Sequence, residues 1–139
     1  MSLQRISASP NFLPRLLLVD GLATGATALL LLTAADVLAP LLQLPAGLQR
    51  AAGLICVPFV AWILVLSRRS AVPQGAMTAV IAINFAWVAG SAWVAFGGNW
   101  QPSPFGVAFV SAQALVVLAF AELGWLGLRA SRRTAPVPA

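Results

Sequence analysis

Four long apolar segments account for most of this chain, and their length decides what the chain can fold into. They cover about residues 16–38, 46–67, 76–96 and 105–128. Each holds about 20 or more residues, which as an α-helix extend about 30 Å and match the hydrocarbon core of a bilayer. The sequence therefore predicts an all-α integral membrane protein that crosses the membrane four times.

The arginines are divided unevenly between the two sides of these segments, and this division sets the predicted orientation. Arg50 lies alone on one side. The other side carries Arg5, Arg15, Arg68, Arg69, Arg129, Arg132 and Arg133. Because cytoplasmic loops carry the excess of positive charge, we expect both termini in the cytoplasm. The short links then predict an antiparallel four-helix bundle, with cytoplasmic tails at 1–15 and 129–139 around a transmembrane domain at 16–128.

The composition favours lipid rather than water as the solvent of this chain. Only 8% of its 139 residues are charged and 60% are hydrophobic, whereas soluble domains carry about 25% charged residues. The sequence pI of about 11.8 is typical of nucleic-acid binding. However, all eight basic residues are arginines beside apolar segments, and a nucleic-acid reader needs a basic face with polar surroundings. We expect no nucleic-acid partner, and the arginines instead suit the lipid bilayer with its anionic headgroups.

The residue types that are missing restrict the chemistry further. The sequence contains no His and no Lys, which argues against most metal sites, haem ligation and Schiff-base cofactors. Its one cysteine, Cys56, allows no internal disulfide and is expected to be a buried, inert thiol. We therefore expect no metal and no covalent or metal-bound cofactor. Tightly held lipids, quinones or pigments without a His ligand stay compatible with the sequence.

Two acidic residues fall inside the apolar segments at similar depth. Asp20 follows Arg15 by five residues and Glu122 precedes Arg129 by seven, so they lie about 7 and 10 Å from these arginines along their helices. An ionised carboxylate there is costly unless it is paired, hydrated or protonated. If the two acids face each other they can share a proton and form a proton-coupled site. If they do not, each makes a structural polar contact, Asp20 with Arg15 or a hydroxyl and Glu122 with an arginine.

Central amides offer a second candidate site. Asn84, Trp87 and Ser91 share one face of the third segment because they recur at helical spacing. Gln113 in the fourth segment lies nine residues from Glu122 and should face roughly the opposite way. An amide in hydrocarbon needs a partner. Asn84 and Gln113 are therefore expected either to join helices by hydrogen bonds or to line a cavity for a small ligand.

The first segment carries a helix-packing motif. Gly21 and Gly25 have G-x-x-x-G spacing and Ala28 continues the same small face, which lets two helix backbones approach closely. The partner can be an internal helix or another subunit.

The ends of the segments are marked by residues suited to the membrane interface. Trp93 and Trp100 lie near the predicted outer boundary and Trp125 near the inner one, where amphipathic rings are favoured as anchors. Asp36, close to the outer end of the first segment, is expected to be an ordinary interfacial carboxylate paired with Arg50.

Several stretches resemble a known group of proteins. They are LLLVDGLATGATALLL, LQRAAG, INFAWVAGSAW and AQALVVLAFAELGWLGLRA. Together they cover about residues 15–129, and their arrangement resembles that of small uncharacterised four-helix proteins of the bacterial inner membrane. The resemblance implies a multi-pass protein of the bacterial cytoplasmic membrane but no established activity. The chain lacks the Glu-centred first helix of the small multidrug exporters, which have a similar size.

Two functional hypotheses follow from these observations. In the first, the chain is a non-enzymatic accessory subunit that packs in a larger membrane complex or a homo-oligomer. In the second, it is a small proton-coupled transporter or a lipophilic-ligand-binding membrane protein that uses Asp20 and Glu122, with Asn84 and Gln113 orienting the ligand. No nucleophile–base pair is visible in the sequence, so we do not expect an enzyme.

Overall fold

A computed structural model describes residue 7 and residues 9–134, and within this part of the chain the secondary structure is helical. The labelled helices are α2 (Phe12–Thr33), α3 (Ala35–Leu42), α4 (Ala46–Ser67), α5 (Gln74–Phe96) and α6 (Pro104–Thr134). Of these, α2, α4, α5 and α6 are long and apolar enough to span a membrane. The prediction of an all-helical chain with four long apolar helices is confirmed. The predicted tails are described only in part, because residues 1–6, 8 and 135–139 lie outside the described residues.

Most helix boundaries lie close to the predicted ones. The second span was predicted at 46–67 and α4 has these bounds, while α5 begins two residues before the predicted start at 76. In contrast, α2 begins at Phe12 and α6 continues to Thr134, so both helices extend into the predicted tails. Arg129, Arg132 and Arg133 support the extension of α6, because arginine favours helices and positive charge near a helix C-terminus is stabilising.

The predicted C-terminal end of the first span, at residue 38, is wrong. The helix α2 ends at Thr33 instead of residue 38, and Ala34 leaves the helical conformation with φ −111° and ψ 10°. A separate short helix, α3, follows and contains Pro40. Proline lacks the N–H for one helical hydrogen bond, and α3 ends two residues later, before Gln43 in the left-handed conformation (φ 53°). Pro40 therefore lies close to the end of α3, whereas α2 ends seven residues before this proline.

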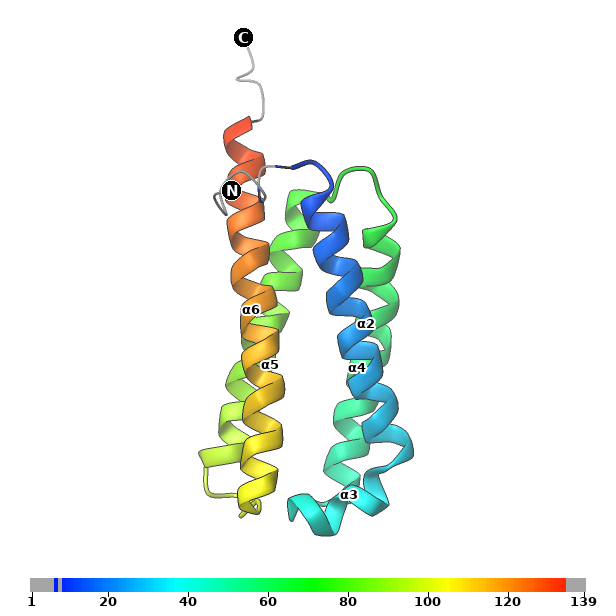
Figure 1. Cartoon of the computed structure of the whole chain (residues 1–139), viewed down its shortest axis with the longest axis vertical. Coiled ribbons are helices and arrows are strands. Elements are labelled where there is room, and N and C mark those ends of the chain that lie inside the picture. The colour runs from blue at the N-terminus through cyan, green and yellow to red at the C-terminus, as the bar shows by residue number, and fades with distance from the viewer. Residues whose placement is uncertain (1–6, 8, 135–139) are drawn as a thin grey trace.

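The long helices pack as two pairs. The first helix pair is α2 with α4, and the second helix pair is α5 with α6. Far fewer contacts join the two pairs, and most of them are made to α6 by α2 and by the short helix α3. Figure 1 shows the pairs side by side, with the start of α2, the end of α4 and the end of α6 at the same end of the molecule. We call this the arginine-rich end, because it carries Arg15, Arg68, Arg69, Arg129, Arg132 and Arg133. Arg50, near the start of α4, lies at the opposite end.

The first helix pair is held together by small residues. A Cβ added to Gly21 would lie 2.6 Å from Leu64 of α4, and one added to Gly25 would also contact an α4 side chain. A Cβ added to Gly53 of α4 would lie 3.2 Å from the carbonyl oxygen of Ala28. The small face of α2 predicted from the G-x-x-x-G spacing therefore packs against α4, which is an internal helix rather than a second subunit.

Buried apolar side chains of the described residues gather at the two ends of the molecule. At the arginine-rich end the cluster comprises Leu13, Leu17, Ile63, Leu66, Met77, Val80, Ile81 and Leu128. At the opposite end it comprises Leu42, Leu44, Ala95 and Val110. The first cluster draws on both helix pairs. The second joins α5 and α6 to α3 and the link that follows it, with Leu48 of α4 packed against it.

Large apolar side chains cover the outside of every long helix. Leu22 of α2, Leu54 of α4, Phe96 of α5 and Leu115 of α6 are 62%, 62%, 71% and 65% exposed. Such a surface is unfavourable in water and suits contact with lipid.

Candidate functional site: a groove between the helix pairs

Asp20 is the centre of a buried polar contact between the pairs. Its side chain is only 1% exposed. One carboxylate oxygen accepts a hydrogen bond of 2.9 Å from the Thr24 hydroxyl, one helical turn along α2. The other accepts a bond of 3.1 Å from Nδ2 of Asn84 on α5. Hydrogen bonds of this kind lower the free-energy cost of burying a carboxylate in a membrane. The bond to Asn84 also makes Asp20 a contact between the two helix pairs.

The structure does not bring Asp20 and Glu122 together. Glu122 is exposed on α6, whereas Asp20 is buried. The buried face of α6 near Glu122 is formed instead by Ala121 and Gly124. Equal depth along two helices says nothing about the direction in which each side chain points, and the pairing hypothesis depended on depth alone. Thr24, which sequence reasoning did not single out, could have been found from its i, i+4 spacing to Asp20.

Gln113 joins the two helices of the second pair. Its Oε1 accepts a bond of 2.9 Å from Nε1 of Trp87. Its Nε2 donates to Oγ of Ser91 at 2.8 Å and to the Val110 carbonyl at 2.9 Å. The amide is thus hydrogen-bonded at both ends, as expected for a polar group in hydrocarbon. Trp87 and Ser91 lie on the α5 face predicted from their spacing, and so does Asn84, which bonds to Asp20 instead.

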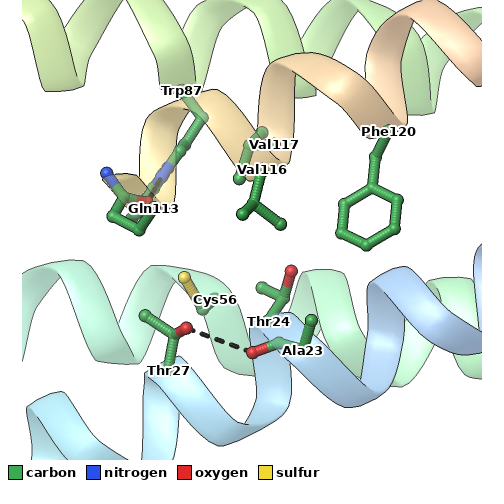
Figure 2. A pocket seen from close by; sticks show the side chains of 9 residues that line it. All are labelled: Ala23, Thr24, Thr27, Cys56, Trp87, Gln113, Val116, Val117 and Phe120. Carbon is green, nitrogen blue, oxygen red and sulfur yellow. Dashed lines mark hydrogen bonds between the residues drawn. The ribbon is translucent and has the colours of Figure 1, made fainter. Parts of the chain in front are cut away.

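Two cavities lie between the helix pairs, and we refer to them together as the groove. Figure 2 shows the smaller one, with a volume of about 120 Å³. One wall carries Ala23, Thr24, Thr27 and Cys56 of the first pair, and the facing wall carries Trp87, Gln113, Val116, Val117 and Phe120 of the second pair.

The larger cavity has a volume of about 460 Å³ and lies toward the opposite end. It shares Thr27, Trp87 and Gln113 with the smaller cavity. Its remaining lining residues are mostly apolar and come from both pairs and from α3: Leu31, Leu42, Leu44, Leu48, Gln49, Ala51, Ala52, Ile55, Ile83, Ala86, Gly90, Ser91, Val94, Phe109 and Val110. Ligand sites are typically cavities of about 300–1,000 Å³ with an apolar lining and a few placed polar groups, and the larger cavity has this character.

Hydrogen bonds join the two sides of the groove near both ends of the molecule. Near the arginine-rich end, the Asp20–Asn84 bond joins α2 to α5. At the opposite end, Ser103 joins the start of α6 to α3, because its hydroxyl donates to the Leu41 carbonyl at 2.6 Å and its backbone N–H donates to the Leu42 carbonyl at 3.0 Å. These bonds also satisfy carbonyls at the end of α3 that have no partner within the helix. The pairs are therefore fixed at two levels and separated between them.

Of the two predicted central amides, only Gln113 lines the groove. Asn84 is not among the lining residues and joins the helix pairs instead. Cys56 contributes a buried thiol to the smaller cavity. Among the described residues, no group of three or more His, Cys, Asp or Glu side chains could hold a metal ion. The groove therefore offers apolar surface, hydroxyls and amides.

The residues predicted at the membrane boundaries lie near helix ends or, for Trp100, in the link between α5 and α6. Arg50 forms an ion pair of 2.5 Å with Asp36 of α3. Trp93 is exposed near the end of α5, whereas Trp100 packs against the apolar cluster at the opposite end. Trp125 lies near the arginine-rich end, where the guanidinium carbon of Arg129 is 4.5 Å from the centre of its ring.

The chain matches no protein-family model, no curated protein and no solved structure. The assignment of the site therefore rests on its own chemistry.

Proposed function

We propose that this chain is a small, non-enzymatic membrane protein that binds a lipophilic ligand in the groove between its two helix pairs. The observation that carries the proposal is the larger cavity, with its volume of about 460 Å³ and its mostly apolar lining. In a bilayer such a cavity is accessible to lipid-soluble molecules, and dispersion contacts with its walls would hold an apolar chain. The few polar groups along it, such as Gln113 and Thr27, can orient a ligand.

The chemistry of the lining supports binding rather than catalysis. Cys56 is the one thiol of the groove, and the lining residues include no carboxylate and no basic side chain that could activate it. Proton-coupled transport by Asp20 and Glu122 has less support, because one acid is buried beside Asn84 and the other is exposed on α6.

The proposal includes the placement of the chain in the membrane. We place it as an antiparallel four-helix bundle in the bacterial cytoplasmic membrane, as a member of the small four-helix group that it resembles, with both termini in the cytoplasm. The gathering of arginines at the end shared by the start of α2 and the end of α6 supports this orientation.

Two single-cysteine variants test the orientation. In a Cys56→Ala background, Ser70→Cys and Asn99→Cys are made at exposed positions in the links that follow α4 and α5. A membrane-impermeant thiol reagent added to intact spheroplasts is expected to label only Asn99→Cys. Labelling of Ser70→Cys alone would reverse the proposed orientation.

Ligand binding is tested by comparing the lipids that accompany matched variants. Gly90 lines the larger cavity and Gly75 does not, and a Cβ added at either position meets no atom within 4 Å. Gly90→Leu should therefore fill the groove without displacing the helices, and Gly75→Leu is the control. Each variant is extracted from native membranes in polymer nanodiscs, and its lipids are measured by mass spectrometry. The proposal expects a lipophilic compound enriched with the wild type and Gly75→Leu but depleted with Gly90→Leu, and identical lipid profiles would contradict it.

A role as an accessory subunit or homo-oligomer is the second candidate, and the exposure of Glu122 favours it. A carboxylate on the outside of a membrane helix is stabilised by a partner outside the bundle. Crosslinking in native membranes followed by purification in mild detergent tests this role. Capture of a second chain that is lost in Glu122→Leu is expected, and recovery of the free monomer alone would exclude it.

A further inference from the structure

One buried acceptor in the groove has no donor. Gln49 is 4% exposed, and its Nε2 donates to the Leu44 carbonyl at 3.0 Å. Among the described residues, its Oε1 is the buried side-chain polar atom without a hydrogen-bond partner. Since only the NH₂ end of the amide can donate to a carbonyl, the oxygen is fixed as the unpaired end. Native structures contain few such groups, and each one calls for an explanation.

The position of Gln49 suits the head of a membrane lipid. It lies in the first turn of α4 and lines the larger cavity at the end that carries Arg50. From Leu48 to Cys56 the two cavities follow α4, a length of about 12 Å. A molecule seated here would have its polar end beside Gln49 and its apolar body extending toward the membrane centre.

We infer that the groove takes a neutral long-chain alcohol whose hydroxyl donates a hydrogen bond to Oε1 of Gln49. The inference rests on the proposed function and specifies the ligand for that same groove. The ligand needs a donor because the unpaired atom is an acceptor. It is neutral because no lining residue of either cavity is charged. Its body is apolar because the rest of the larger cavity is lined mainly by aliphatic and aromatic side chains.

Other common lipids fit this site less well. An ionised fatty acid presents only acceptor oxygens, which would face another acceptor at Gln49. Its charge, like that of a phospholipid headgroup, would need a cation, and Arg50 nearby is already paired with Asp36. The geometry therefore favours an uncharged hydroxyl over a carboxylate or a phosphate.

The test compares three probes that share one chain: hexadecanol, hexadecyl methyl ether and palmitate. Their dissociation constants for the purified full-length chain in nanodiscs are measured by scintillation proximity at neutral pH. Wild type, Gln49→Met, Gly90→Leu and Gly75→Leu are compared. Methionine keeps the approximate shape of glutamine and removes the acceptor. One hydrogen bond predicts that hexadecanol binds the wild type about 2- to 12-fold more tightly than the ether does.

The outcomes separate this inference from the proposed function. We expect the preference for hexadecanol over the ether to vanish in Gln49→Met. We expect Gly90→Leu to raise the dissociation constants of both probes. Palmitate should bind most weakly of the three. Equal binding of alcohol and ether to the wild type would overturn the assignment of the hydroxyl and leave the groove as a ligand site. Binding that is equal in Gly90→Leu and Gly75→Leu, or absent for all probes, would overturn the groove itself. The comparison of alcohol and ether in the wild type stands even if Gln49→Met fails to fold.

Discussion

The hydrogen bond between Asp20 and Asn84 should couple the two helix pairs measurably. Both side chains are almost fully buried, at 1% and 3% exposure, and Nδ2 of Asn84 lies 3.1 Å from Oδ2 of Asp20. Hydrogen bonds between membrane helices average about 0.6 kcal/mol and reach about 1.7 kcal/mol, and burial of both partners strengthens such a bond. We therefore expect a coupling free energy of about 1–1.7 kcal/mol between these two positions.

A double-mutant cycle measures this coupling. The variants are Asp20→Ala, Asn84→Ala and the double variant, and unfolding by sodium dodecyl sulfate in mixed micelles is followed by tryptophan fluorescence. The cycle cancels the separate costs of the two truncations. Thr33→Ala serves as the control, because this exposed hydroxyl bonds only to a carbonyl of its own helix. Its free energy of unfolding should change by no more than about 0.5 kcal/mol.

The result that would refute this reasoning is additivity. If the double variant loses the sum of the two single losses, the bond contributes nothing, and the helix pairs are held near the arginine-rich end by apolar packing alone. Asn84→Ala by itself should be destabilising by about 1–3 kcal/mol, since Asp20 is then left with the Thr24 hydroxyl.

Two further predictions use the same unfolding assay. A Cβ added to Gly106 would overlap the backbone carbonyl of Leu42, so Gly106→Ala should destabilise the chain by about 1–3 kcal/mol. The control is Gly75→Ala, which has open space around it and should be neutral or slightly stabilising. Equal effects of the two substitutions would contradict the close contact of α3 with α6. The Asp36–Arg50 pair is exposed, so Arg50→Gln should lower the free energy of unfolding by less than about 1 kcal/mol. That loss should shrink at high salt, and a larger or salt-independent loss would mean that the pair has another role.

Sequence reasoning predicted the features that local chemistry determines. The bounds of α4 match the predicted segment 46–67, which Arg68 and Arg69 follow, and the helical content follows from four apolar segments of membrane-spanning length. The break at Ala34 was not predicted, because neither glycine nor proline marks that position.

The groove could not be predicted from the sequence. It depends on how far apart two helix pairs are held, and that separation is set by contacts between distant residues such as Asp20 with Asn84 and Ser103 with Leu42. Spacing alone placed Trp87 and Gln113 on suitable faces, but it could not show that they bond to each other. Gln49 was missed because a polar residue at the start of a helix usually faces the headgroups, and only its burial distinguishes it.

The most direct test of the groove is to locate a bound chain by photolabelling. The full-length protein in nanodiscs is equilibrated with a hexadecanol that carries a diazirine near the middle of its chain, irradiated, and mapped by peptide mass spectrometry. We predict that labels concentrate on groove residues deeper than Gln49, such as Trp87 and Gln113, and that Gly90→Leu suppresses them. Labels spread evenly over outward-facing side chains such as Leu22 and Leu115, unchanged in Gly90→Leu, would contradict a ligand site between the helix pairs.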